Sequence, residues 1–275
     1  MSSFVDQVMA APNAKYLSKL ANARVVVFGG SSGIGFCVAE AAIEHGAFVT
    51  IVSSNEQKLA DAQSRILARY PDRSEHITSS VCDLSKKDDA EPEIKKALDL
   101  AANAGPTAPG SIDHIVFTAA GSLASTPLAE MKSSVIDESF SVIFFGGTLV
   151  AKQASKYLRP SPSSSLTYTG GASTYKPGHG REILAGLGGA MEGLSRGLAV
   201  TLKPVRVNLV SPGGVVTERW GSFGDIGPIS EKYKAESTTG SLGTPEDLAE
   251  AYLYLMKDKF VTGSVIHSNG GRLLV

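Results

Sequence analysis

The sequence predicts an α/β fold, a single doubly wound parallel sheet of seven strands with helices on both faces. Two observations lead to this prediction. Short apolar segments rich in β-branched residues, such as RVVVF at Arg24–Phe28, are typical of strands that are buried on both faces of a parallel sheet. Segments with helical spacing alternate with these strands along almost the whole chain. Parallel strands joined by helices require right-handed crossovers within one open sheet.

Each strand is predicted from a short apolar segment, and each helix from apolar residues spaced three to four apart with a recognisable end signal. The predicted strands are Arg24–Phe28, Phe48–Ser53, Ile77–Cys82, Asp113–Thr118, Ser165–Thr169, Val205–Val210 and Gly263–His267. The predicted helices are Gly33–Gly46, Asn55–Tyr70, Glu91–Asn103, Ser141–Leu158, Gly189–Leu202, whose first turn could begin earlier, and Pro245–Met256 after a Thr244 cap. We assign residues 1–23 to an N-terminal extension and residues 24–275 to the domain.

The composition limits the classes of partner. Hydrophobic residues make up 43% of the 275 residues and charged residues 19%, which is enough apolar material for a large core. The formal net charge is -1, so no overall field attracts nucleic acid or an anionic membrane.

Cys37 and Cys82 belong to no CxxC pair and are expected to be buried thiols in a reducing compartment. With no visible secretory signal and no run of about 18 apolar residues, we expect a cytoplasmic protein without a membrane span or a metal site.

A glycine-rich turn lies between the first predicted strand and the first predicted helix. In this context Gly29 permits a tight turn, Gly33 lets the backbone approach a pyrophosphate, and Gly35 brings the helix against the sheet. The free N–H groups at the helix N-terminus attract phosphate. The turn predicts a Rossmann-like dinucleotide site, although its spacing departs from GxGxxG and a turn without a ligand is the alternative. The residues assigned to the cofactor here are Gly29, Ser31, Ser32, Gly33, Ile34 and Gly35.

The end of the second strand indicates which dinucleotide is bound. An acidic residue at this place holds the ribose 2′-hydroxyl of NAD and repels the 2′-phosphate of NADP. The sequence instead has Ser53, Ser54 and Asn55, with no carboxylate before Glu56, and Lys58 one helical turn further on. Neutral donors and a cation can accept a phosphate, so the sequence favours NADP(H). Ser54 could also serve as a helix N-cap, and the two roles can coexist.

Several motifs, taken in order, resemble the short-chain dehydrogenase/reductase family. Its TGxxxGxG turn is matched by Gly29–Gly35, with Phe28 in place of Thr, and its adenine-binding Asp by Asp83 at the end of the third strand. From its position alone, Asp83 could equally cap the next segment. Ala119-Ala120-Gly121 stands where the family has NNAG, and Ser211–Thr217 matches its PGxVxT stretch. The resemblance extends from about Arg24 to Val275.

The resemblance implies further site residues and an assembly. It places Val215 and Thr217 at the nicotinamide carboxamide. With them it assigns to the cofactor Ala119, Ala120, Gly121, Pro212 and Gly213. In the family the helices corresponding to Ser141–Leu158 and Gly189–Leu202 form subunit contacts, which implies a homodimer or homotetramer.

The catalytic residues of the family are not matched. The family uses an Asn-Ser-Tyr-Lys tetrad, in which a YxxxK pair on one helix turn lowers the pKa of the tyrosine. Aligning Gly189–Leu194 with the usual AAVEGL segment puts other residues at the four tetrad positions: Ile143, Gly171, Leu184 and Gly188. None of these side chains can exchange a proton, and no YxxxK occurs in this region.

The replacement of the tetrad limits the kinds of substrate that the enzyme could reduce. Reduction of a ketone needs an acid for the developing alkoxide, which contributes roughly 10²- to 10⁴-fold in rate. Hydride addition to an iminium ion gives a neutral amine and needs no proton. We therefore predict an NADP(H)-dependent oxidoreductase that transfers hydride to a bulky small molecule. An imine or iminium is the leading case and a carbonyl the other, and the enzyme is similar to tetrad-lacking fungal members of secondary metabolism. The alternatives are a cofactor-assisted cyclase or isomerase, of Diels–Alder type for example, and a non-catalytic NADP-binding protein.

Another acid could come from the polar loop after the fifth strand. Ligands bind at the carboxyl ends of such strands. Thr169, Tyr175 and His179 are the candidate catalytic residues, with Arg181 as a further donor, and His179 is the best titrating group among them. The alternative is that they are ordinary exposed loop residues. Trp220 stands where the family has a substrate lid, and packing within the lid is its expected role.

Overall fold

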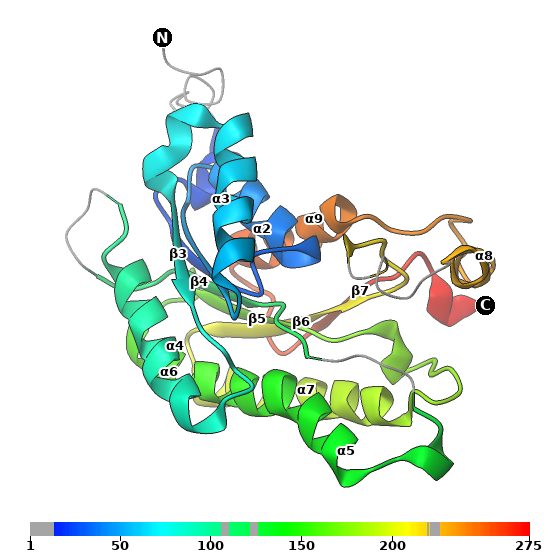
Figure 1. Ribbon diagram of the computed structural model, residues 1–275. Helices are drawn as coiled ribbons and strands as arrows, with labels where there is room; N and C mark the ends of the chain where they lie inside the picture. The colour runs from blue at the N-terminus through cyan, green and yellow to red at the C-terminus, as the bar shows by residue number, and fades with distance from the viewer. Residues whose placement is uncertain (1–13, 106–109, 122–125, 219, 221–225) are drawn as a thin grey trace.

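The computed structural model describes residues 14–105, 110–121, 126–218, 220 and 226–275, and in these the chain forms one open parallel sheet (Figure 1). The strand order is β3-β2-β1-β4-β5-β6-β7, with every neighbouring pair parallel. The strands are β1 Arg24–Phe28, β2 Phe48–Ser53, β3 Ile77–Val81, β4 His114–Phe117, β5 Ser165–Thr169, β6 Arg206–Pro212 and β7 Val265–Ser268. The predicted fold class is confirmed, and the order reverses between β1 and β4.

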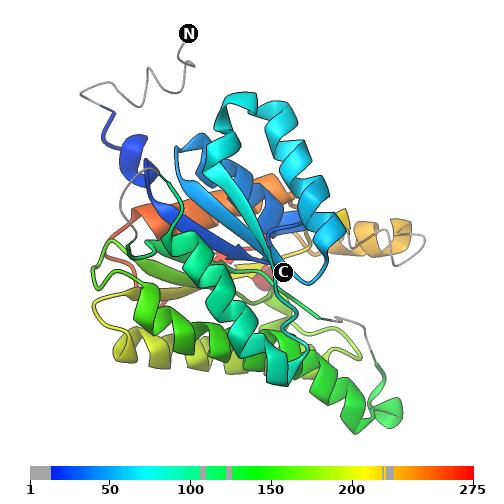
Figure 2. The same ribbon diagram turned by 60° about the vertical axis from the view of Figure 1, so that its left-hand side comes forward.

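Helices cover both faces of the sheet. They are α2 Gly33–Glu44, α3 Glu56–Arg69, α4 Lys87–Ala102, α5 Ser133–Phe140, α6 Gly147–Tyr157, α7 Glu182–Thr201, α8 Gly227–Ala235 and α9 Pro245–Lys257. The helices α2, α3 and α9 pack on one face, and α4, α6 and α7 on the other, so that each face has its own apolar cluster (Figures 1 and 2). The five residues of β1 are all buried, as the continuous apolar segment predicts.

The residues before β1 join this core. Leu20 lies in a short 3₁₀ turn, Ser18–Leu20, and is fully buried in the cluster that contains α2 and α9. The Lys19 ammonium group donates to the carbonyl oxygen of Lys257 at the end of α9. The described part of the expected extension is therefore packed against the domain. Its first part, residues 1–13, lies outside the described residues.

Several helices begin earlier than their periodicity predicts. The helix expected from Ser141 is preceded by α5 and by a π turn, Ser141–Gly146, which runs directly into α6. The helix α7 begins at Glu182, seven residues before Gly189, and α4 begins at Lys87 and tolerates Pro92 within it. The last helix begins as predicted, because Thr244 forms a capping box with Asp247. The helix α8 was not predicted.

Among the described residues, one helical stretch is long and apolar enough to cross a membrane by length and composition. It is Ser133–Tyr157, and 33% of its most apolar window is buried within the chain. Its α6 part packs against α4 in the layer that covers the sheet, which accounts for one apolar side of the helix.

Candidate functional site

A cavity of about 640 Å³ opens at the carboxyl ends of the strands, next to the point where the strand order reverses. In open α/β sheets this is the place where ligands bind, and the volume suits a cofactor together with a small molecule. Every residue that the sequence assigned to the cofactor lines it: Gly29, Ser31, Ser32, Gly33, Ile34, Gly35, Ser53, Ser54, Asn55, Lys58, Asp83, Ala119, Ala120, Gly121, Pro212, Gly213, Val215 and Thr217.

The glycine-rich turn has the geometry of a phosphate-binding turn. Gly29 and Gly33 have φ angles of 86° and 53°, which favour glycine over other residues. A Cβ atom on Gly35 would lie 2.3 Å from the carbonyl oxygen of Gly29 and 2.4 Å from Oγ1 of Thr118. The absence of a side chain at Gly35 therefore lets α2 approach β1 and its turn. As a result, the N-terminus of α2 is directed at the cavity.

The far end of the cavity is polar. The Ser31 hydroxyl donates to the Ser53 hydroxyl over 2.9 Å, which joins the glycine turn to the end of β2. Asn55 is the N-cap of α3, because its side-chain oxygen accepts a 2.9 Å hydrogen bond from the Lys58 N–H. The N-cap of α3, for which Ser54 was a candidate, is therefore Asn55. The Ser54 hydroxyl, the Asn55 amide donors and the Lys58 ammonium group are left at this end of the cavity, a donor set that suits a phosphate.

Asp83 caps the turn after β3 and also lines the cavity. Its Oδ1 atom accepts hydrogen bonds from the Ser85 N–H, at 3.1 Å, and from the Ser85 hydroxyl, at 2.6 Å. This is the turn-capping role. The Oδ2 atom lies 3.9 Å from the Lys86 ammonium nitrogen, and the residue lines the cavity beside the end of β3. One carboxylate oxygen therefore fixes the turn, while the other is available to a ligand.

All four positions aligned with the tetrad also line the cavity, and none of them presents a polar side chain there. These positions are Ile143, Gly171, Leu184 and Gly188. A Cβ atom on Gly188 would lie 1.9 Å from the Oγ1 atom of Thr174, so Thr174 fills the space that a longer side chain would need. At Gly171 no atom of the described residues lies within 4 Å of such an atom. The four positions therefore contribute only apolar or absent side chains to this end of the cavity, and Gly171 leaves room for a ligand.

The predicted catalytic residues are not arranged as proton donors. Thr169 lines the cavity, but its hydroxyl donates to the Phe117 carbonyl over 2.8 Å and lies 2.6 Å from the Tyr252 hydroxyl, which is fully buried. A hydroxyl has one proton, so Thr169 has none left for a substrate. Thr169 can therefore contact a ligand only through its methyl group or by accepting a hydrogen bond.

The structure does not bring Tyr175 or His179 into the cavity. The short 3₁₀ turn Ala172–Thr174 redirects the loop, and the Tyr175 ring packs edge-on against His267, with the ring centroids 5.0 Å apart. Burial and a hydrogen bond with Glu192 raise the pKa of Tyr175 to about 12. His179 is exposed and does not line the cavity, whereas Arg181 does. Arg181 is the one of these loop donors that faces a ligand.

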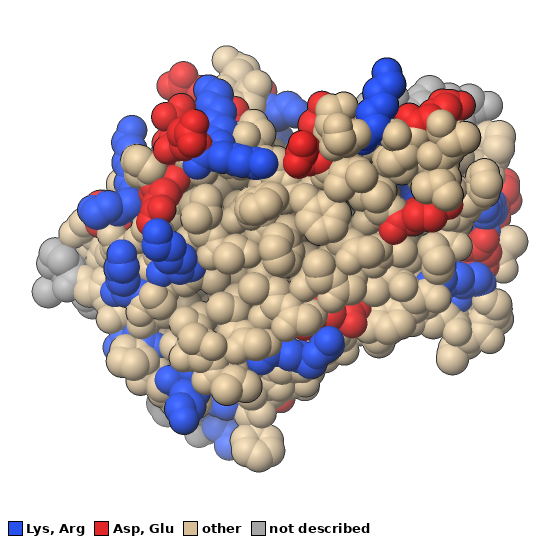
Figure 3. Space-filling view, turned by 90° about the horizontal axis from the view of Figure 1, so that it is seen from below, with Lys and Arg blue, Asp and Glu red and all other residues tan. Residues whose placement is uncertain are grey.

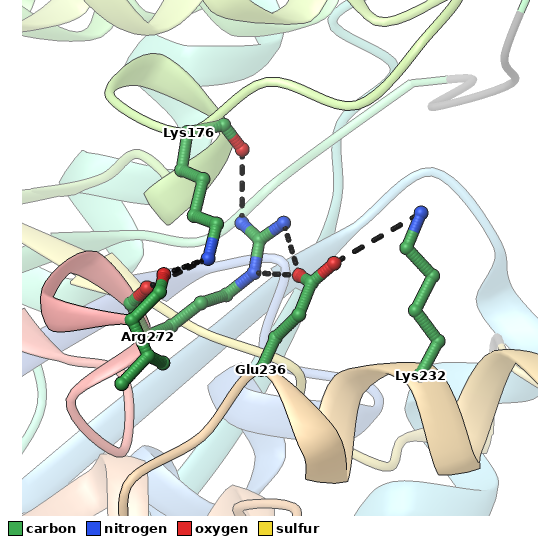
Figure 4. Close-up of polar contacts among 5 residues, drawn as sticks. Lys176, Lys232, Glu236 and Arg272 are labelled. Atoms are coloured by element: carbon green, nitrogen blue, oxygen red, sulfur yellow. Dashed lines mark hydrogen bonds and ion pairs between the residues drawn. The ribbon is translucent and has the colours of Figure 1, made fainter.

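Sequence reasoning missed the wall formed by α8 and the C-terminal turn. Arg272 lines the cavity and is 5% exposed, although nothing in the sequence around it marks it as a site residue. Two of its nitrogens lie 2.8 Å from Oε2 of Glu236, and a third donates to the carbonyl oxygen of Lys176 over 3.1 Å (Figure 4). The Lys176 ammonium group donates in turn to the backbone oxygens of Arg272 and Val275. These contacts join the loop after β5, the end of α8 and the C-terminal turn.

Aromatic residues complete the same wall. The Arg272 guanidinium group lies over the Tyr233 ring, 5.1 Å from its centroid, and the Trp220 ring packs against Tyr233 with centroids 5.8 Å apart. Trp220 and Tyr233 both line the cavity. Trp220 is therefore packed against another side chain, as expected, and it also lines the cavity.

An open parallel sheet whose first β–α junction carries a glycine-rich turn, facing a cavity at the strand ends, defines an α/β nucleotide-binding protein. The model of an SDR-like Rossmann domain matches residues 16–275. The chain is 40% identical over 268 residues to the short-chain dehydrogenase/reductase malC of Malbranchea aurantiaca, covering 96% of this chain and 99% of that one. The chain belongs to the short-chain dehydrogenase/reductase family.

Other relatives agree with this assignment. The short-chain dehydrogenase/reductase fsr5 of Gibberella fujikuroi is 39% identical over 264 residues, which cover 94% of this chain and 98% of that one. The structure of MalC, described as a reductase/Diels-Alderase, matches with a TM-score of 0.87 over 94% of this chain and all of that one. A small-chain dehydrogenase in complex with NADPH matches with a TM-score of 0.70 at 25% identity, covering 92% of this chain and all of that one. The fold binds a nicotinamide cofactor in this family.

Proposed function

We propose that the protein is an NADP(H)-dependent reductase that transfers hydride to a bulky small molecule whose reducible group is an imine or iminium. One observation carries the proposal. A complete set of cofactor-binding positions lines the same cavity as four tetrad positions that hold no proton-exchanging side chain. The fungal relatives malC and fsr5 support a role in secondary metabolism, and malC is described as a reductase.

The choice of NADP over NAD rests on the end of β2. The Ser54 hydroxyl, the Asn55 amide and the Lys58 ammonium group line the cavity there, and the first carboxylate in the chain after β2 is Glu56, which does not. One cation and several neutral hydrogen-bond donors favour binding of a dianionic 2′-phosphate, whereas a carboxylate at the end of β2 would repel it. The related dehydrogenase in complex with NADPH is consistent with this choice.

Bound in this site, the reduced nicotinamide supplies a hydride. The N-terminus of α2 would hold the pyrophosphate, and Thr217 would orient the nicotinamide carboxamide, as its place in the family motif implies. The apolar side chains of Ile143, Leu184, Leu187 and Met191 exclude water from the reacting carbon atom. When hydride adds to the carbon of a C=N⁺ group, the nitrogen takes the π electron pair and becomes a neutral amine. An iminium ion therefore needs no proton from the enzyme, and a neutral imine would first take its proton from water and react as the iminium. The absence of a proton donor at the tetrad positions is compatible with this reaction.

An absorbance assay tests this function. Reduced nicotinamide should be consumed with cyclic iminium substrates, whereas the matching ketones should react slower by roughly 10² to 10⁴, the usual contribution of a general acid. Between neutral and mildly alkaline pH, the iminium rate should not depend on an enzyme group. Ketone reduction as fast as iminium reduction would contradict the proposal.

A second candidate function is favoured by the MalC comparison. MalC is described as both a reductase and a Diels-Alderase, and a roomy apolar cavity suits the shaping of a cyclisation. In that case the cavity walls position a reactive diene and dienophile, and the cofactor is a further wall. Conversion of a substrate to its cyclised product without loss of reduced nicotinamide would distinguish this activity. Turnover of either kind would exclude a purely non-catalytic role.

We also propose that two copies associate through α7. Four of its glycines lie on one face, and a Cβ atom on any of them would meet no atom of the described residues within 4 Å: Gly186, Gly189, Gly193 and Gly197. Each glycine costs a helix about 1 kcal/mol relative to alanine, and no close packing with the described part of the chain explains their presence. The face that contains α7 also carries few charged side chains in its centre (Figure 3). A second copy packed closely on these glycines accounts for both features.

Replacement of Gly193 by leucine is expected to separate the copies. The bulky side chain would hold the two helices apart, so the mass measured by analytical ultracentrifugation should fall to that of one chain. The control is Ser64→Leu on the exposed face of α3, which adds the same apolar group far from α7 and should leave the mass unchanged. An unchanged mass in Gly193→Leu would contradict this assembly.

We expect this enzyme in the cytoplasm, since Cys37 and Cys82 are both free and buried.

A further inference from the structure

Glu218 places its carboxylate at the N-terminus of α2. Its Oε2 atom accepts a hydrogen bond of 2.9 Å from the N–H of Gly33, the first residue of the helix. This N–H group is one of those that a helix cannot satisfy internally, at the end where its dipole attracts anions. The Ser32 side chain does not cap the helix, and the first turn holds no acidic residue. Glu218 therefore supplies the missing negative charge from a distant part of the chain.

The second oxygen of the same carboxylate has a partner as well. Oε1 of Glu218 lies 3.5 Å from NH1 of Arg65 on α3. The Arg65 guanidinium group is itself held over the Phe36 ring, 3.9 Å from its centroid. Glu218 thus lies between the helix N-terminus and a fixed cation. If the carboxylate leaves Gly33, Arg65 remains beside it.

Packing brings this segment directly onto the start of the helix. A Cβ atom on Gly33 would lie 3.2 Å from Cγ2 of Thr217 and 3.7 Å from Oε2 of Glu218. Both residues line the cavity beside the glycine-rich turn. A backbone N–H makes one strong hydrogen bond, so a phosphate oxygen that binds the Gly33 N–H must take the place of Oε2.

We propose that Glu218 is a built-in competitor of the cofactor pyrophosphate. It satisfies the N-terminus of α2 in the empty enzyme, leaves Gly33 when the dinucleotide binds, and is then held by Arg65. This inference rests on the proposed function, because it concerns the same dinucleotide site. The competition lowers the affinity for the cofactor and speeds its release. When the pyrophosphate displaces Glu218, the neighbouring Thr217 moves as well, and we assign Thr217 to the nicotinamide carboxamide.

The test is the affinity for NADPH, measured by calorimetry. Glu218→Ala should bind NADPH about 3- to 10-fold more tightly than the wild type, since the side chain is 54% exposed and water screens the contact. Glu218→Gln, which keeps the shape and removes the charge, should show a smaller gain. Adenosine 2′-monophosphate lacks the pyrophosphate and should bind all three proteins equally. Glu231→Gln on α8 removes the same charge at an exposed residue that does not line the cavity, and it should behave as the wild type.

A double-mutant cycle with Arg65 provides an independent result. Arg65→Met should weaken NADPH binding by about 2- to 3-fold, because the displaced carboxylate loses its countercharge near the pyrophosphate. In the Glu218→Ala background the same change should have no effect. Equal NADPH affinity in the wild type and both Glu218 variants, or an Arg65 effect that persists without Glu218, would overturn the inference while leaving the proposed function intact. If neither the wild type nor Glu218→Ala binds NADPH, both fail.

Discussion

The Gly35→Ala variant is expected to lose dinucleotide binding. Its Cβ atom would lie 2.3 Å from the Gly29 carbonyl oxygen and 2.4 Å from Oγ1 of Thr118, and the first of these is a backbone atom that cannot rotate away. The turn or the helix must therefore shift. Overpacking of this kind costs about 1 to 3 kcal/mol, and a shifted helix N-terminus no longer presents its N–H groups to the pyrophosphate. We expect the Kd for NADPH to rise by about 100-fold or more, equivalent to about 2.7 kcal/mol.

The measurement is NADPH calorimetry together with thermal unfolding of both proteins. Gly178→Ala is the matched control, because among the described residues its Cβ atom would meet the Arg181 side chain alone, at an ordinary contact distance of 3.8 Å. It adds the same methyl group to a half-buried glycine of the loop after β5 that does not line the cavity, and it should bind NADPH as the wild type does. Wild-type affinity in a folded Gly35→Ala protein would show that the cofactor does not depend on the close approach of α2 to its turn.

The Ser54→Asp variant is expected to reverse the choice of cofactor. Ser54 follows β2 and lines the polar end of the cavity, where we propose that the 2′-phosphate of NADP binds. A carboxylate there repels this phosphate and can accept a hydrogen bond from the ribose 2′-hydroxyl of NAD. We expect the ratio of NADPH to NADH affinity to fall by about 100-fold, a change of about 2.7 kcal/mol divided between weaker NADPH and stronger NADH binding.

Two further variants show whether this effect is local. Ser74→Asp introduces the same charge at an exposed residue that does not line the cavity, and the ratio should not change. Lys58→Gln should weaken NADPH binding and leave NADH binding unaltered, since only NADPH carries the phosphate that Lys58 would pair with. A ratio that stays constant in Ser54→Asp would refute the assignment of the 2′-phosphate to the end of β2.

The sheet and many of the residues that line the cavity are predictable because their signals are local. A segment such as Arg24–Phe28 is apolar throughout, since a strand in a covered parallel sheet is buried on both faces. The glycine turn and the end of β2 lie at the carboxyl edge of neighbouring strands, so their residues must converge in one cavity. The helix α8 and the first turns of α5 carry short polar segments without a clear period, and packing against the domain decides where they form.

The rest of the site depends on contacts between distant segments. The Thr169 hydroxyl is engaged by Tyr252, 83 residues away, and Gly33 by Glu218, 185 residues away. Arg272 faces the cavity because Glu236 and Lys176 hold it there. No short motif encodes such pairs. The sequence allowed Tyr175 and His179 as proton donors because it does not give the direction of the loop after Ala172. The structure shows that neither residue lines the cavity.

The most direct test of a dinucleotide in this cavity is the fluorescence of Trp220, the one tryptophan in the chain. Trp220 lines the cavity, and its emission overlaps the absorption of reduced nicotinamide. Addition of NADPH should quench Trp220 saturably and produce emission from the bound nicotinamide, and excess NADP⁺ should reverse both signals. If millimolar NADPH leaves the Trp220 emission unchanged and produces no transferred emission, the cofactor does not occupy this cavity and the account is wrong.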